Sequence, residues 1–205
     1  MNVVLASGNA GKLKELGALL APYDMTLVAQ GELGIEPAPE TACTFVENAL
    51  EKARHASRES GLAAIGDDSG IAVDGLDGAP GIYSARYAGE HGDDAANNTK
   101  LIATLKARGL MAENGEPSER TSAHFFCVVV LLRHPEDPTP LIASGRWNGQ
   151  ITGRPHGSNG FGYDPHFWLP ERALTAADLP SEEKNRISHR ALAVAALTRQ
   201  LGDAF

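Results

Sequence analysis

Two adjacent carboxylates, Asp67 and Asp68, follow the short apolar run LAAI in the segment GDDSG. Acids at a strand end can bind Mg²⁺ through oxygen ligands, or one can bind the metal while the other acts as a general base on water. Neighbours on an extended strand point to opposite faces, so both need not reach the same ion. A solvated acidic turn is the alternative. Glu40, in a loop stiffened by prolines, is a further carboxylate candidate.

A glycine-containing segment, SGNAGK, runs from Ser7 to Lys12 and joins an apolar strand to a helical pattern. Gly8 and Gly11 allow a tight turn that exposes backbone N–H groups at a helix N-terminus. That geometry binds phosphate, and Lys12 adds a positive charge. The spacing is not that of a Walker A loop. The segment predicts a phosphate site, with an ordinary strand–helix turn as the alternative.

Two later segments carry groups suited to a nucleobase. In GSNGFGYD, residues 157–164, Phe161 can stack on a base while Asp164 accepts a base N–H. The alternative is a loop anchored by its aromatic rings. The segment KNRISHR, residues 184–190, places polar and basic side chains on or beside the last predicted helix, where a solvated helix surface is the alternative.

The hydrophobic periodicity predicts the elements that must position these residues. Strands are expected over 2–6, 25–29, 62–66, 121–134 and 141–152, with a short strand after the glycine-rich segment 156–170. Helices are expected over 12–21, 45–60, 93–109 and 181–201. Thr44 is the predicted N-cap of the second helix, with Glu47 as its capping-box partner and Gly61 at its end; Ser181 is the predicted N-cap of the last.

This order of elements predicts an α/β fold with a mixed, partly antiparallel sheet and flanking helices. The strand LAAIG is expected to deliver the acidic segment at its C-terminal end. The two long strands are expected to form a hairpin. Glycine-rich loops then fall at strand ends, where open α/β sheets bind ligands.

The bulk composition narrows the function classes. The chain has 205 residues, 42% of them hydrophobic, enough for one sizeable core or two small lobes. The net charge is -8 and the basic residues are scattered, which argues against a nucleic-acid polymer as partner. No apolar run reaches the roughly 18 residues of a membrane span. Cys43 and Cys127 lie far apart, with Cys127 in the apolar run FFCVVVLL, so a buried thiol and a reducing cytoplasm are expected.

Taken in order, the motifs resemble those of the noncanonical purine nucleoside triphosphate pyrophosphatases, the inosine/xanthosine triphosphate or dITP/XTP pyrophosphatases. The resemblance covers nearly the whole chain and rests on SGNAGK, ETACTFVENALEKA, DDSGIAVDGLDGAPGIYSARYAG, GSNGFGYDPHF and SEEKNRISHRALA. It implies one domain over 1–205, built as two lobes around an elongated sheet, with a substrate cleft between the lobes, and a homodimer in the cytoplasm. It also implies Mg²⁺-dependent hydrolysis of ITP, dITP and XTP to the monophosphate and pyrophosphate.

The resemblance further implies a role for each site residue. Asp68 matches the metal-binding proton acceptor, Glu40 a second metal ligand, and Lys52 a catalytic lysine directed at the phosphates. The matching substrate-binding residues are Ser7, Gly8, Asn9, Ala10, Gly11 and Lys12 in the phosphate loop, Ser69 beside the acids, Phe161, Gly162, Tyr163 and Asp164 around base and sugar, and Lys184, His189 and Arg190 for base recognition.

The implied chemistry is coherent. Mg²⁺ on Glu40 and Asp68, with Lys12 and Lys52, would offset the repulsion between an acidic protein and a triphosphate. Donors from His189 or Arg190 would suit the O6 acceptor of hypoxanthine or xanthine and would face the N6 donor of adenine. Two other functions stay open: a nucleotide pyrophosphatase of different base preference, and a nucleotide-binding regulator that does not hydrolyse.

Overall fold

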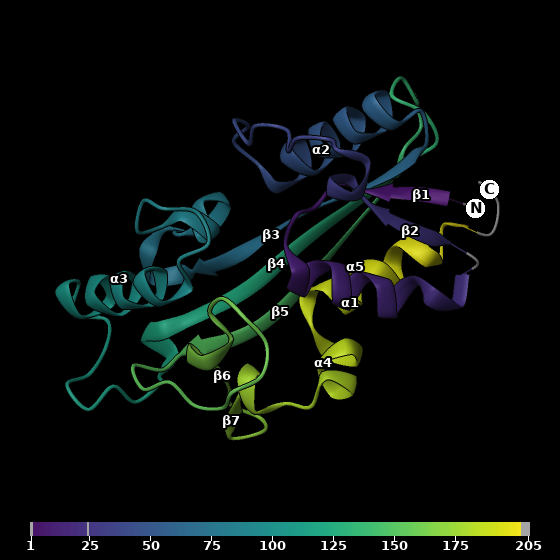
Figure 1. Ribbon diagram of the computed structural model, residues 1–205. Helices are drawn as coiled ribbons and strands as arrows, with labels where there is room; N and C mark the ends of the chain where they lie inside the picture. The colour runs from purple at the N-terminus through teal and green to yellow at the C-terminus, as the bar shows by residue number, and fades with distance from the viewer. Residues whose placement is uncertain (1, 24, 202–205) are drawn as a thin grey trace. The chain divides into compact units, whose positions relative to one another are not determined.

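The computed structural model describes residues 2–23 and 25–201 and is an α/β fold (Figure 1). Its strands are β1 (Asn2–Leu5), β2 (Thr26–Ala29), β3 (Ala63–Val73), β4 (Ser122–Leu132), β5 (Leu141–Ile151), β6 (Phe167–Leu169) and β7 (Leu174–Thr175). Its α-helices are α1 (Ala10–Leu20), α2 (Phe45–Ser60), α3 (Asp94–Ala107), α4 (Ser181–Ile187) and α5 (His189–Thr198). None of the helices in the described part of the chain is long and apolar enough to cross a membrane.

The strands form one seven-stranded sheet in the order β2-β1-β3-β4-β5-β6-β7. Strand β1 pairs in parallel with both β2 and β3, whereas β6 pairs antiparallel with β5 and β7. The sheet is therefore mixed, as predicted. Strands β4 and β5 are neighbours in it, as a hairpin requires. The two-residue strand β7 was not predicted, because so short a segment has no periodicity.

The chain divides into two compact units, and each has its own hydrophobic core. Unit 1 comprises the described residues of Met1–Ser69, Cys127–Gly145 and Ser188–Phe205, and unit 2 those of Gly70–Phe126 and Arg146–Ile187. The core of unit 1 includes Leu5, Leu16, Cys127 and Leu197, all with no exposed surface. The buried Cys127 confirms its prediction. The cleft between two lobes and the description as one domain stay predictions.

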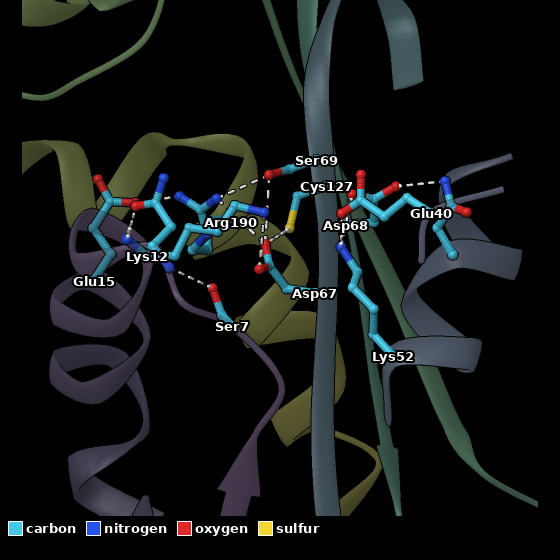
Figure 2. A network of polar contacts seen from close by, with 12 residues as sticks. Ser7, Lys12, Glu15, Glu40, Lys52, Asp67, Asp68, Ser69, Cys127 and Arg190 are labelled. Atoms are coloured by element: carbon cyan, nitrogen blue, oxygen red, sulfur yellow. Dashed lines mark hydrogen bonds and ion pairs between the residues drawn. The ribbon is translucent and has the colours of Figure 1, made fainter. Parts of the chain in front are cut away.

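Unit 1 has a helix layer on each face of β3 (Figures 1 and 2). Helix α2 lies on one face, and it begins and ends where predicted. The Thr44 side chain accepts the Glu47 N–H and also donates to the Glu47 carboxylate, and Gly61 ends the helix with φ at 70°. On the other face, α1 and α5 lie beside each other. A residue on β3 therefore meets one helix layer or the other, depending on its position in the strand.

The acidic pair lies inside β3, so the prediction that it follows the end of a strand is wrong. Strand β3 continues from Ala63 to Val73 through GDDSG. Gly66, the last residue of the predicted strand, lies inside β3 and serves close packing. A Cβ at Gly66 would lie 2.2 Å from the carbonyl oxygen of Ala49 in α2. The glycine lets the helix approach the strand, which stays extended.

The single C-terminal helix of the prediction is also wrong, because the chain breaks at Ser188. Helix α4 begins at Ser181, within one residue of the predicted cap. Ser188 has extended backbone with ψ at 160°, and its hydroxyl accepts the Ala191 N–H at 3.2 Å. Serine hydroxyls compete with helix hydrogen bonds in this way, and here the result is a new N-cap for α5.

Unit 2 has a core rich in aromatic rings. The Phe167 ring lies 4.6 Å from that of Phe125 and 5.2 Å from that of Trp147, between ring centroids. Helix α3 packs onto this core through Leu101 and Leu105, both fully buried. Unit 2 also contains the glycine-rich segment at residues 157–164, which we call the FGYD loop. The core thus supports the loop that sequence analysis assigns to the base.

Candidate active site

Asp67 and Asp68 point to opposite faces of β3 and bond different cations (Figure 2). The Asp67 carboxylate lies 3.0 Å from Lys12 Nζ of α1, whereas that of Asp68 lies 3.0 Å from Lys52 Nζ of α2. This split follows from the alternation of side chains along a strand. It confirms that the two acids need not reach one ion.

On the α2 face, one ammonium group joins two carboxylates. Lys52 Nζ lies 2.8 Å from Glu40 Oε1 and 3.0 Å from Asp68 Oδ1. Asn48, one turn earlier in α2, donates from Nδ2 to Asp68 Oδ2 at 3.1 Å. Every carboxylate oxygen of Asp68 is therefore held by a side chain of α2, which fixes the orientation of the group.

The surroundings shift the pKa of both partners. Burial raises the pKa of Asp68 and Glu40 adds to the rise, while Lys52 opposes it. Burial alone would lower the pKa of Lys52, but the charges of Asp68, Asp67 and Glu40 outweigh it and the pKa is raised. Lys52 therefore stays charged, and Asp68 binds a proton more readily than an ordinary aspartate.

The residues on this face fit a magnesium ion that arrives with a phosphate ligand. Across residues 2–23 and 25–201, no group of three or more His, Cys, Asp or Glu side chains forms a metal cluster. Mg²⁺ in nucleotide sites typically takes only one or two carboxylates, with phosphate oxygens and waters completing its shell. Glu40 and Asp68, which converge on one cation in this structure, supply that donor set.

On the other face, Asp67 is a fully buried carboxylate between two cations. Its oxygens lie 3.0 Å from Lys12 Nζ and 3.3 Å from Nη2 of Arg190. The thiol of Cys127 donates weakly to it, with Sγ at 3.8 Å. Burial alone would raise the pKa of Asp67, but Lys12 and Arg190 outweigh it and hold the pKa far below its ordinary value. Asp67 thus stays charged at neutral pH and pairs with both cations.

Arg190 is buried at the start of α5 and bonds three groups of unit 1. It pairs with Glu15 of α1 and with Asp67, and its Nη2 donates to the Ser69 hydroxyl at 3.0 Å. Burial opposes its charge, but the acids raise its pKa above the ordinary value. These contacts give Arg190 a structural role at the acidic pair, and its predicted role at the base stays a prediction. His189, the residue before it, is likewise buried in α5.

The predicted phosphate loop leads into helix α1. Asn9 is the N-cap, and its side-chain oxygen accepts the Lys12 N–H at 3.0 Å. The Ser7 hydroxyl accepts the Asn9 N–H at 3.2 Å, which folds the loop back over the end of β1. Gly8 is exposed, while Lys12 is directed inward onto Asp67. Ala10 and Gly11 begin the helix. The loop therefore presents a helix N-terminus with a fixed cation, an arrangement that suits phosphate.

In unit 2, the FGYD loop brings an aromatic ring, a carboxylate and an ammonium group together. Lys184 Nζ of α4 lies 2.6 Å from Asp164 Oδ2 and 5.0 Å from the centroid of the Phe161 ring. The same Asp164 oxygen accepts the Phe161 N–H at 2.9 Å. Tyr163 is anchored, since its hydroxyl donates to the Ser84 carbonyl at 2.8 Å. Sequence analysis placed the FGYD residues around base and sugar and grouped Lys184 with His189 and Arg190; the structure brings Lys184 onto Asp164 within unit 2.

Several residues that organise these groups were missed by sequence analysis. Asn48 fixes Asp68, Glu15 pairs with Arg190, and both Asp94 and Asn98 of α3 bond the FGYD loop. Asn48 lies four residues before Lys52 on one helix, a spacing that could have indicated it. The other contacts join segments far apart in the chain, and no local pattern in a single sequence predicts them.

The matches to known proteins extend over the same segments. The model of the Ham1 family matches residues 3–200. This chain belongs to the Ham1 family. A relative called dITP/XTP pyrophosphatase, from Xanthomonas oryzae pv. oryzae, is 58% identical over 98% of this chain and 96% of its own length. One of the same name from Escherichia coli O157:H7 is 55% identical over 94% and 93%.

Structural comparison agrees with this family membership. The solved HAM1 protein of Coxiella burnetii matches over 100% of both chains, with a TM-score of 0.87 and 43% identity. The resemblance stated from the motifs is therefore confirmed at the level of the Ham1 family. The predicted fold class, a mixed α/β sheet with flanking helices, is confirmed as well.

Proposed function

We propose that this chain hydrolyses noncanonical purine nucleoside triphosphates, namely ITP, dITP and XTP, to the monophosphate and pyrophosphate. One observation carries the proposal: Glu40 and Asp68 converge on Lys52 in unit 1, in a Ham1-family chain that is 58% identical to a relative called dITP/XTP pyrophosphatase. This donor set suits a metal-bound phosphate chain.

In the proposed site, residues of unit 1 bind the phosphates. The N-terminus of α1 and Lys12 would take part of the charge, since backbone N–H groups at a helix start favour anions. Lys52 would neutralise further phosphate charge from the α2 face. Ser69, whose hydroxyl accepts from Arg190 and donates to Asp67 at 3.4 Å, would turn this hydroxyl toward a phosphate oxygen.

Asp68 is the proposed proton acceptor for the attacking water. Asn48 and Lys52 hold its carboxylate in place, so it meets a water molecule in a fixed orientation. Glu40 and Asp68 would hold Mg²⁺, which when bound would stabilise negative charge on the phosphates and the leaving pyrophosphate. Water attacks the α-phosphorus, the bond to the bridging oxygen breaks, and Asp68 takes the proton, so no covalent intermediate is needed.

Base recognition is assigned to the FGYD loop and Lys184 in unit 2, and to His189 and Arg190 on α5. Phe161 would stack on the purine, and Asp164 and Lys184 offer an acceptor and a donor within hydrogen-bond distance of each other. A protein donor placed for the O6 acceptor would face the N6 amino donor of adenine, and leaving such a buried group unpaired costs about 1–3 kcal/mol.

The proposal includes a homodimer. Sedimentation analysis tests this by measuring whether the mass is twice that of the chain.

Turnover measured as pyrophosphate release tests the proposal. We expect the purified chain with Mg²⁺ to hydrolyse ITP, dITP and XTP much faster than ATP, GTP or pyrimidine triphosphates. Faster turnover of a pyrimidine triphosphate would contradict the proposed base preference and favour a nucleotide pyrophosphatase of different base preference. Tight nucleotide binding without pyrophosphate release would favour the regulator.

A further inference from the structure

Both backbone polar groups of Gly162, in the FGYD loop, bond side chains of α3. The Gly162 N–H donates to Asp94 Oδ2 at 2.7 Å, and Asn98 Nδ2 donates to the Gly162 carbonyl at 2.8 Å. Gly162 has φ at 62°, a conformation that L residues rarely adopt and that glycine adopts readily. Two side chains of one helix therefore hold the loop at the residue where its backbone reverses.

Helix α3 does not use these two side chains to cap itself. The N-cap is Asp93, whose Oδ1 accepts the Ala96 N–H at 2.9 Å. Asp94 and Asn98 are four residues apart and so lie on one face of the helix. The Asn98 amide also donates to the Asp94 carbonyl at 2.9 Å, which fixes its orientation. Of these two adjacent acids, Asp93 caps the helix and Asp94 bonds the loop.

The residues on either side of Gly162 are those assigned to the base. Phe161 N–H donates to Asp164 Oδ2, and that oxygen also lies 2.6 Å from Lys184 Nζ. A rotation at Gly162 would therefore change the position of the Phe161 ring relative to the carboxylate and the ammonium group. The contacts of α3 oppose such a rotation because they hold both peptide groups that flank the Gly162 Cα.

We propose that Asp94 and Asn98 are positioning residues for base recognition, acting through Gly162 on Phe161 and Asp164. This inference rests on the proposed function. The two side chains bond the loop backbone at Gly162 and do not bond the side chain of Phe161 or Asp164 in these contacts. Their effect is expected on the base and not on the phosphates, because the phosphate groups are assigned to residues of unit 1.

The test compares Asp94→Ala and Asn98→Ala with the matched control Asp93→Ala, which removes the cap of the same helix and no bond to the loop. We expect Asp94→Ala and Asn98→Ala each to lower kcat/KM for ITP by about tenfold, as for one lost hydrogen bond. The ratio of kcat/KM for ITP to that for ATP should therefore decrease. Inhibition by inosine monophosphate should weaken, whereas inhibition by pyrophosphate should stay unchanged. Asp94→Asn keeps an oxygen acceptor for the Gly162 N–H and should restore most of the loss.

Several results would overturn the inference. One is an unchanged ITP-to-ATP ratio in Asp94→Ala and Asn98→Ala. Another is an equal change in Asp93→Ala at matched thermal stability, which would trace the effect to the helix as a whole. If inhibition by inosine monophosphate and inhibition by pyrophosphate weakened equally, that would also contradict a role at the base. Failure of the proposed function is distinguishable, because then the wild-type chain itself would not prefer ITP.

Discussion

Asp67 and Asp68 are consecutive in the chain, yet their carboxylates bond lysines from helices on opposite faces of β3. Asp67 holds Lys12 and Arg190 and is fully buried, whereas Asp68 shares Lys52 with Glu40. Substitutions at the two positions should therefore have different consequences, one at the proton acceptor and one at the support of the phosphate-binding lysine.

We expect Asp68→Asn to fold and to lose activity by about 10²-fold or more, because the change removes both a metal-binding charge and the proton acceptor. Pyrophosphate release from ITP at saturating Mg²⁺ measures this loss. Asn48→Ala is the matched control, since it removes a bond that orients Asp68 but keeps the charged carboxylate itself, and it should lose less activity. Near-normal turnover by a folded Asp68→Asn protein would exclude Asp68 from the mechanism.

Asp67→Asn should chiefly affect stability. Removing one partner of a buried ion pair costs about 3–5 kcal/mol in the free energy of unfolding. Here Lys12 loses its ion pair with Asp67, and Arg190 keeps only the one with Glu15. The pKa of Asp67 is lowered in the folded chain, so its contribution is present above the ordinary value of 3.8 and is lost as the pH falls below it. The stability difference from wild type, measured by urea unfolding, should thus be constant near neutral pH and shrink below about pH 4.

The same variant should raise KM for all triphosphates alike, because Lys12 loses the carboxylate that positions it. Lys12→Ala is the reference for that effect, as it removes the ammonium group itself. A stability difference that does not change between neutral and acidic pH would show that Asp67 is not charged in the folded state. A change in base preference would show that Lys12 acts elsewhere than on the phosphates.

Arg190→Ala separates the predicted base contact from the observed ion pairs. If Arg190 reads O6, the ratio of kcat/KM for ITP over ATP should narrow by about tenfold, as for one lost charge-assisted hydrogen bond. We expect this narrowing together with a lower melting temperature, since Glu15 and Asp67 lose a buried partner. An unchanged ratio, with both substrates losing activity in proportion, would leave Arg190 only its role in holding Asp67.

We expect activity to require a divalent cation and to favour Mg²⁺ over Ca²⁺, because few carboxylates with phosphate oxygens suit a small octahedral ion. Titration of the metal in a chelator-buffered assay measures the dependence. Glu40→Gln should shift the titration to higher Mg²⁺ concentration at unchanged saturating ITP. Full turnover in excess chelator would contradict the assignment of Glu40 and Asp68.

Local signals in the sequence predicted much of the fold. The cap at Thr44 with Glu47, followed by the glycine at 61, determined both ends of α2, because capping depends on neighbouring residues. The extent of β3 was not predictable in this way. The predicted strand ended at Gly66, whereas β3 continues to Val73, and only the tertiary structure shows that Gly66 lets α2 approach an extended strand there.

The candidate site was likewise predictable only in part from local sequence. The residues that carry chemical groups, such as Asp68, Lys52 and Lys12, were predicted from motifs. The side chains that orient them, such as Glu15 on Arg190 or Asp94 on Gly162, join segments many residues apart. Such contacts depend on the tertiary fold, so residue spacing alone cannot predict them.

The two cysteines differ sharply in their surroundings, and this gives the chain an internal reporter. Cys43 is exposed, whereas Cys127 is buried behind Asp67, and burial together with that carboxylate raises its pKa to about 12. Alkylating reagents attack the thiolate, so Cys43 should be labelled at once and Cys127 only while unit 1 is open. The rate of the second labelling then measures how often unit 1 opens at β4, the strand that carries Cys127, in a chain without any attached probe.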